Sequence, residues 1–244
     1  MAREKKLKVF SFFPNLGVNA CAYMRYVKTD DIPESYRYGG SNQCRSSLSQ
    51  EDYAKVIPKF IKSDRSVKKL AEVFGSATSI EVVSEKFKSI IETLEPNIHQ
   101  FSPITVLNYK DEPWEGNYYS LRVMTYLTAL QVDKSGVIWT KQHDGMYGLA
   151  IDNPREYYFN LARVKGYHLW QHEPYVIPGL LCSREFRAAC LEAKIPSLCW
   201  MKTQHHVVDE PWTDFGNTQP KDAYDPKISK RDRLVRDTSL NSIQ

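Results

Sequence analysis

The chain has 244 residues, of which 42% are apolar and 12% aromatic. This supplies enough apolar side chain for the core of one large or two modest domains, so a globally disordered protein is excluded. No stretch approaches the roughly 18 apolar residues of a membrane-spanning helix. Residues 1–10 are basic but lack the apolar region of a secretion signal, so we expect a cytoplasmic protein that does not enter a membrane.

The net charge of +4 is concentrated at the two ends of the chain. Residues 3–8 carry four basic residues against one acidic residue, and residues 227–236 carry five against one. The remainder therefore has a net charge of −3. A mildly acidic body argues against a broad nucleic-acid-binding face, which would gather basic residues on one surface. Binding of DNA or RNA by the basic ends alone stays open as an alternative.

The cysteines predict a reduced protein. They are odd in number and show no C-x-x-C spacing: Cys21, Cys44, Cys182, Cys190 and Cys199. Reduced thiols fit the cytoplasm. Two of the five lie on or beside an apolar helical stripe, where a thiol serves as a small apolar side chain.

The N-terminal third opens with two expected strands, at residues 9–13 and 20–26. A polar loop follows, with turn residues at 30–31 and 39–40. A helix is then expected to begin at Ser49 and to kink or end at Pro58.

A second helix is predicted over residues 66–75. Its apolar residues have the i, i+3, i+4, i+7 spacing of one buried helix face: Val67, Leu70, Ala71 and Phe74. Gly75 is a natural stop for such a helix.

A pattern of strand, capped helix and strand occurs twice, 99 residues apart. Ser84 and Ser183 each follow an apolar run and precede an apolar stripe with helical spacing. The stripes are Phe87, Ile90, Ile91 and Leu94, and then Phe186, Ala189, Cys190 and Ala193. Each serine should therefore cap a helix, and extended runs should follow at residues 98–101 and 198–201.

The rest of the chain is expected to be rich in strands up to a polar tail. Residues 118–130 are dense in aromatic and aliphatic side chains, and extension resumes at residues 137–140 after a turn at 133–136. Residues 157–164 and 167–170 flank Lys165-Gly166, which predicts a β-hairpin.

Together these elements predict a mixed α+β fold, in which two related strand–helix–strand repeats pack with a β-rich central segment. The expected division is an N-terminal lobe with the first repeat (1–125), a C-terminal lobe with the second repeat (126–212) and a polar tail (213–244).

Histidines and carboxylates define the main alternative, a metal-dependent hydrolase that uses His168, His172, His205, His206 and Asp209. The set lacks H-E-x-x-H, so surface histidines that make hydrogen bonds are the favoured interpretation. A Cys190 nucleophile with His205 is a weaker alternative. Phosphate-binding loops and the nucleophile elbow are missing from the sequence. We therefore expect no catalytic residue, no metal and no cofactor.

The charge pattern near the end of the chain suggests a partner-binding segment. Residues 209–225 have a net charge of −4, with aromatic rings among the carboxylates. Such a segment suits an interface with a basic partner, because the rings anchor and the charges steer. The candidate contact residues are Asp209, Glu210, Trp212, Asp214, Phe215, Asp222, Tyr224 and Asp225.

Four blocks carry a resemblance to a known family: residues 82–87 leading to 98–103, residues 118–123 leading to 130–135, residues 166–170 and residues 181–186. In these spaced apolar and serine positions the chain resembles a large family of bacterial immunity proteins. Members are encoded beside polymorphic toxins that are delivered by contact-dependent or type VI secretion.

The resemblance implies a cytoplasmic protein without catalytic residues. It would bind and block its own cognate toxin, often a nuclease, and so protect the producing cell. The implied partner is that toxin, with no nucleic acid and no membrane, and the oligomeric state is left open.

Overall fold

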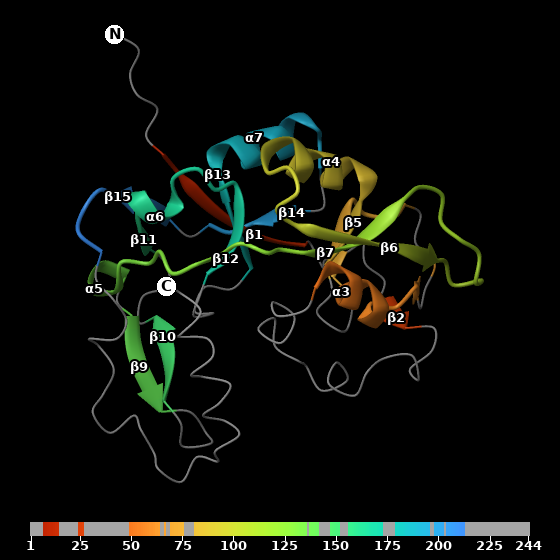
Figure 1. Ribbon diagram of the computed structural model, residues 1–244, viewed down its shortest axis with the longest axis horizontal. Coiled ribbons are helices and arrows are strands. Elements are labelled where there is room, and N and C mark those ends of the chain that lie inside the picture. Colours follow the sequence, from red (N-terminus) through yellow and green to blue (C-terminus); the bar gives the residue numbers. More distant parts are fainter. Residues whose placement is uncertain are drawn as a thin grey trace.

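The computed structural model describes residues 7–14, 24–26, 49–63, 66, 69–75, 81–135, 137–141, 147–151, 156–172, 179–195, 198–202 and 204–212. Within these residues the fold is mixed α+β, as predicted, and most of its elements are strands. Two larger sheets carry the core. Helices α4 (Glu85–Leu94) and α7 (Arg184–Glu192) pack against each other along one side of the molecule (Figure 1).

The first sheet has the strand order β2-β3-β6-β7-β5-β4 within the described residues. Its strands are β2 (Met24–Tyr26), β3 (Phe60–Ser63), β4 (Val73–Gly75), β5 (Glu81–Ser84), β6 (Gln100–Leu107) and β7 (Tyr118–Arg122). Helix α3 (Gln50–Val56) contacts this sheet at β6. It starts after its N-cap Ser49 and ends before Pro58, as predicted.

The second sheet has the order β14-β1-β13-β12-β8. Its strands are β1 (Val9–Pro14), β8 (Tyr126–Leu127), β12 (Leu169–His172), β13 (Leu180–Ser183) and β14 (Leu198–Trp200). Strand β1 pairs with both β13 and β14. The N-terminal strand therefore lies in the sheet of the C-terminal half, although the lobe predicted over residues 1–125 groups it with the first half.

Two strand pairs and two short helices complete the described part. Strands β9 (Val137–Lys141) and β10 (Tyr147–Ile151) are antiparallel, and β9 confirms the extension predicted at residues 137–140. Strands β11 (Glu156–Asn160) and β15 (Gln204–Val208) are parallel. The helices are α5 (Val132–Ser135) and α6 (Leu161–Val164).

Helices α4 and α7 occupy matching places in the two sheets. β5 and β6 both pair with β7, and β13 and β14 both pair with β1, always antiparallel. The strand before each helix therefore runs parallel to the strand after it, with one antiparallel strand between them, which is a split β-α-β arrangement. The Oγ atoms of Ser84 and Ser183 accept hydrogen bonds from the N–H groups of Phe87 and Phe186, so both predicted caps form.

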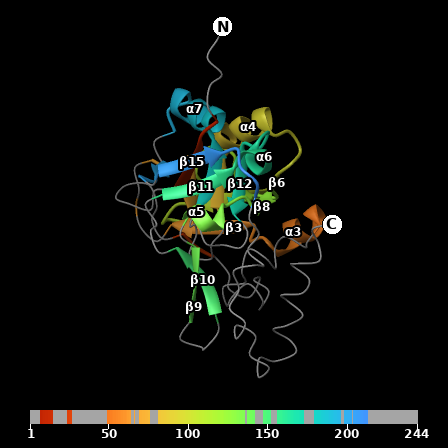
Figure 2. The same ribbon diagram turned by 90° about the vertical axis from the view of Figure 1, so that its left-hand side faces the viewer.

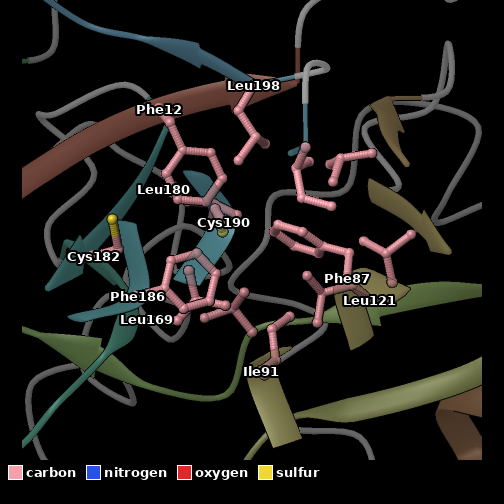
Figure 3. Packing of buried hydrophobic residues seen from close by; sticks show 14 residues of the cluster. Phe12, Phe87, Ile91, Leu121, Leu169, Leu180, Cys182, Phe186, Cys190 and Leu198 are labelled. Atoms are coloured by element: carbon pink, nitrogen blue, oxygen red, sulfur yellow. The ribbon is translucent and has the colours of Figure 1, made fainter. Parts of the chain in front are cut away.

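The two helices meet over a shared apolar core (Figure 3). Phe87 and Phe186 are fully buried, and their rings make an edge-to-face contact with centroids 5.7 Å apart. Phe12 of β1 stacks on Phe186 at 5.9 Å. Each apolar stripe therefore contributes to one common core, and the aromatic contact adds to the area that it buries.

A buried carboxylate joins the end of α4 to the second sheet. Glu95 accepts hydrogen bonds from the N–H groups of His168 (2.7 Å) and Leu169 (3.1 Å). Its Oε2 also lies 2.6 Å from Nε2 of His99, whose Nδ1 accepts a bond from the N–H of Met124. Nε2 of His99 must then carry the ring hydrogen and donate to Glu95. Buried polar groups that are satisfied in this way specify one arrangement of the two sheets.

The helix predicted over residues 66–75 is wrong. Val73–Gly75 forms β4, which pairs with β5, and the described residues 69–72 are not helical. Val73 packs into the core below α4 and α7, whereas Phe74 packs with the cluster around α3. Because successive side chains of a strand point to opposite faces, Val73 and Phe74 can enter different clusters. A helix with a single buried face would direct both toward the same cluster.

The hairpin predicted around Lys165-Gly166 is also wrong. β11 ends at Asn160, whose side chain caps the short helix α6, and β11 pairs with the distant β15. Gly166 does form a turn, with φ of 90°, but the chain leaves it for β12 in the second sheet. The cap at Asn160 cuts the expected strand short, and the local turn therefore joins a helix to a strand.

Candidate functional site

The C-terminal described strand, β15, leads directly into the segment predicted to bind a partner. It lies along β11, close to α5 and α6 (Figure 2). The structure describes this segment as far as residue 212. It includes Asp209, Glu210 and Trp212; the other candidates lie outside the described residues, namely Asp214, Phe215, Asp222, Tyr224 and Asp225.

Side chains of the neighbouring elements hold the backbone of this segment. The side-chain amide of Asn160 donates to the carbonyl of Glu210 at 2.7 Å, and that of Gln131 donates to the carbonyl of Pro211 at 2.9 Å. Nζ of Lys134 lies 2.6 Å from the carboxylate of Glu210, with both side chains about half exposed. Such a pair contributes little to stability, but it fixes where the carboxylate points.

Trp212 and Asp209 differ in exposure. The ring of Trp212 is partly buried, and the guanidinium of Arg163 lies 4.0 Å from its centroid, a cation–π contact. The indole N–H is buried without a hydrogen-bond partner among the described residues. Asp209 is exposed and has no ion pair within the described part of the chain. The described part of this segment, residues 209–212, thus presents one carboxylate without an ion pair, one paired carboxylate and an anchored aromatic ring.

The histidines of the alternative metal site lie in separate environments. His205 and His206 stack on Phe159 and Tyr158 in the β11–β15 pair. Nδ1 of His168 lies 2.8 Å from Oγ of Ser183. Nε2 of the buried His172 accepts the N–H of Leu130, so this nitrogen is already engaged. Across the described residues, no group of three or more potential ligands is placed to hold a metal ion.

The thiol of Cys190 is in the wrong state for a nucleophile. Its side chain is buried in the core below α7, and burial raises its pKa to about 12. Thiolate rather than thiol attacks a substrate, so this cysteine is inert at neutral pH.

Helices α4 and α7 each carry a cation that lies over two aromatic rings, a feature that was not predicted from the sequence. Lys88 of α4 lies over the rings of Phe101 and Tyr119, at 5.7 and 4.5 Å from their centroids. The guanidinium of Arg187 in α7 lies over Phe10 (4.4 Å) and Trp200 (5.3 Å). We call the first group of three side chains the α4 cluster and the second group the α7 cluster.

Part of this feature could have been found in the sequence. The 99-residue shift that relates Ser84 to Ser183 also relates Lys88 to Arg187, and Phe101 to Trp200. The third member is Tyr119 of β7 in one sheet and Phe10 of β1 in the other, and only the strand pairing relates them, because Tyr119 faces Val83 as Phe10 faces Cys182.

Within the described residues, no helix is long and apolar enough to cross a membrane.

Comparisons with known proteins identify the family. No match was found among curated proteins. The profile of an immunity protein family, Imm11, matches residues 11–205, a range that begins within β1 and includes the other strands of both sheets and helices α4 and α7. The chain therefore belongs to the Imm11 immunity protein family.

Proposed function

We propose that this chain is a cytoplasmic, non-enzymatic inhibitor that binds one cognate antibacterial toxin and blocks it by direct contact. The family match over residues 11–205 carries the proposal, because an immunity protein neutralises a toxin. We further propose that the toxin is a nuclease delivered by contact-dependent or type VI secretion.

The first proposed contact is the segment from Asp209 to Asp225. A nuclease binds nucleic acid through a basic surface, and an inhibitor that competes for that surface gains by presenting carboxylates. The exposed Asp209 and the held backbone around Glu210 support this choice. A backbone that is fixed before binding loses less conformational entropy in the complex.

Co-expression tests the function. The toxin encoded beside this gene should kill a sensitive strain, and the chain should restore growth. The purified pair should bind with a Kd near or below about 1 nM, as tight protein inhibitors do. An unrelated immunity protein with a non-cognate toxin target is the control. If no neighbouring gene encodes a toxin, or if the purified pair does not bind, the proposed function is wrong.

Nuclease inhibition is tested separately, by incubating the toxin with DNA and with RNA. Added chain should stop degradation at a one-to-one ratio. A toxin that leaves both substrates intact, yet is neutralised by the chain, would refute only the nuclease part of the proposal.

Charge reversal tests the proposed contact. Asp209→Lys with Glu210→Lys should slow association with the toxin, most visibly at low salt, because steering charges act mainly on the association rate. Trp212→Ala should speed dissociation instead. The double variant Lys134→Glu with Glu210→Lys keeps the net charge and rebuilds the ion pair in the opposite direction, so it shows how much of the effect comes from losing that pair and not from the change in net charge. If the double variant Asp209→Lys with Glu210→Lys and the variant Trp212→Ala both bind like the parent, this segment is not the contact.

We also propose that the two strand–helix units are copies of one ancestral unit, with a sequence boundary near residue 125. Their common strand arrangement and their matched serine caps support this origin. Because β1 completes the second sheet, residues 126–212 expressed alone should not fold, and adding a β1 peptide should restore part of the structure.

A further inference from the structure

The α4 cluster is electrically balanced by its own helix. Nζ of Lys88 lies 3.7 Å from the carboxylate of Glu85 and 3.6 Å from that of Glu92. The hydroxyl of Tyr119 donates a further hydrogen bond to Glu85. The cation that sits over the two rings is therefore surrounded by carboxylates on the same surface.

The α7 cluster has the same framework without that balance. The 99-residue shift places Arg184 where α4 has Glu85, and Leu191 where α4 has Glu92. Arg187 makes no ion pair with any residue that the structure describes, and its Nε is buried without a hydrogen-bond partner there. Leu191 is 54% exposed, the largest exposed fraction of any large apolar side chain in the described part.

These differences define the chemistry of a partner. A guanidinium that packs on aromatic faces still offers N–H groups, and a carboxylate is the acceptor that fits them in a two-point contact. The exposed Leu191, four residues after Arg187 and thus on the same side of α7, would contact an apolar side chain beside that carboxylate. Arginine and tryptophan are also the residues most enriched where binding energy is concentrated.

We propose that the α7 cluster, together with Leu191, is a docking site for a carboxylate-bearing, partly apolar segment of the toxin. This inference rests on the proposed function and adds an anchor to the steering contact at residues 209–225. A carboxylate-bearing toxin segment is favoured over a purely apolar surface as the occupant of this site. The reason is that a half-buried cation without an ion pair among the described residues gains most from an anion.

The test measures binding of the purified full chain to a catalytically inactive form of the neighbouring toxin. Leu191→Glu places a carboxylate four residues from Arg187, as Glu92 stands to Lys88, and its exposed position should leave folding intact. Arg187→Gln removes the charge. Lys88→Gln is the matched control in α4. Thermal unfolding of each variant verifies the fold.

We expect Leu191→Glu and Arg187→Gln each to weaken binding by roughly tenfold or more, chiefly through faster dissociation, while Lys88→Gln stays within about twofold of the parent. If the parent binds the toxin and Leu191→Glu binds equally well, the docking site is wrong while the function stands. Equal losses of toxin binding in the α4 and α7 variants would also overturn the docking site. So would a result in which Leu191→Glu changes only the association of the chain with itself and not its binding to the toxin. If the parent itself fails to bind, the proposed function fails first.

Discussion

The units around α4 and α7 share a framework and differ in what surrounds it. Both have a serine cap, a core phenylalanine and a cation over two rings. Two carboxylates of α4 neutralise Lys88, whereas Arg187 makes no ion pair with any residue that the structure describes. Shared features therefore build the scaffold, and the departures from them mark where the second unit is available for a partner.

The ends of the two helices differ as well. Glu95 follows α4, is 4% exposed and accepts hydrogen bonds from the second sheet. The 99-residue shift places Lys194 at this point after α7, where it is exposed with φ of 53°. The first unit thus holds the second through a buried carboxylate, and the second unit makes no equivalent contact through Lys194 within the described residues.

The largest expected effect concerns what the units share. Phe87→Ala and Phe186→Ala should each lower the free energy of unfolding by about 3–5 kcal/mol, because each deletes a fully buried ring from the common core. The double variant should show a coupling of about 0.5–1.5 kcal/mol for the lost ring contact. Urea denaturation measures all three values. A large loss for only one phenylalanine would show that the two helices do not contribute equally.

The next effect concerns what the units do not share. Glu95→Gln should cost about 1–3 kcal/mol, because the new amide turns an N–H group toward at least one backbone donor. Lys194→Gln is the matched control and should change stability by less than about 0.5 kcal/mol, as exposed substitutions do. Denaturant unfolding of both variants measures the difference. Equal losses would remove Glu95 as the contact that joins the units.

The fold was predictable where local signals agree with the final packing. Ser84 and Ser183 carry both a cap and an apolar stripe, and both helices form there. The region 66–75 has an equally good stripe, yet pairing of Val73 and Phe74 with β5 decides the outcome. The parallel pairing of β11 with β15 joins residues about 50 positions apart, and no local pattern around Lys165-Gly166 encodes that partner.

The candidate site was predictable only as composition. The sequence shows the carboxylates and rings from residue 209 onwards, but it does not show that the side chains of Asn160 and Gln131 bind the backbone carbonyls of Glu210 and Pro211. The histidines were misleading in the sequence. His205 and His206 are adjacent and suggested a cluster, but in the β11–β15 pair His205 stacks on Phe159 and His206 stacks on Tyr158.

A smaller effect concerns the caps. Ser183→Ala should cost about 1 kcal/mol for the lost helix N-cap, together with the loss of the contact between its hydroxyl and Nδ1 of His168. Ser84→Ala should cost somewhat more, because its hydroxyl donates to the carboxylate of Glu72 at 2.5 Å and a hydrogen bond to a charged group is the stronger kind. Ser89→Ala, on the exposed side of α4, is the control and should be nearly neutral. Thermal unfolding compares them, and equal values for both caps would mean that the bond to Glu72 contributes no more than the bond to His168.

The smallest effect is a pH dependence that one unit should have and the other should lack. The hydrogen bond that Tyr119 donates to Glu85 raises the pKa of Tyr119 to about 12, whereas the matching ring in the second unit is Phe10, which has no hydroxyl. The folded protein holds this proton more tightly than the unfolded chain, whose tyrosine pKa is about 10. The stabilisation is therefore complete below about pH 10 and is lost as the pH rises through about 12.

Tyr119→Phe makes the first unit resemble the second and removes this dependence. Because the ring of Tyr119 is partly exposed, we expect the free energy of unfolding of the parent to exceed that of the variant by less than about 1 kcal/mol at pH 8. The difference should shrink between about pH 10 and 12, as the parent loses its proton-linked stability and the variant has none to lose. Urea unfolding of both proteins at matched pH values isolates this residue from the other groups that titrate there. A difference that stays constant across the range would mean that the bond to Glu85 contributes equally in both protonation states, which contradicts the raised pKa.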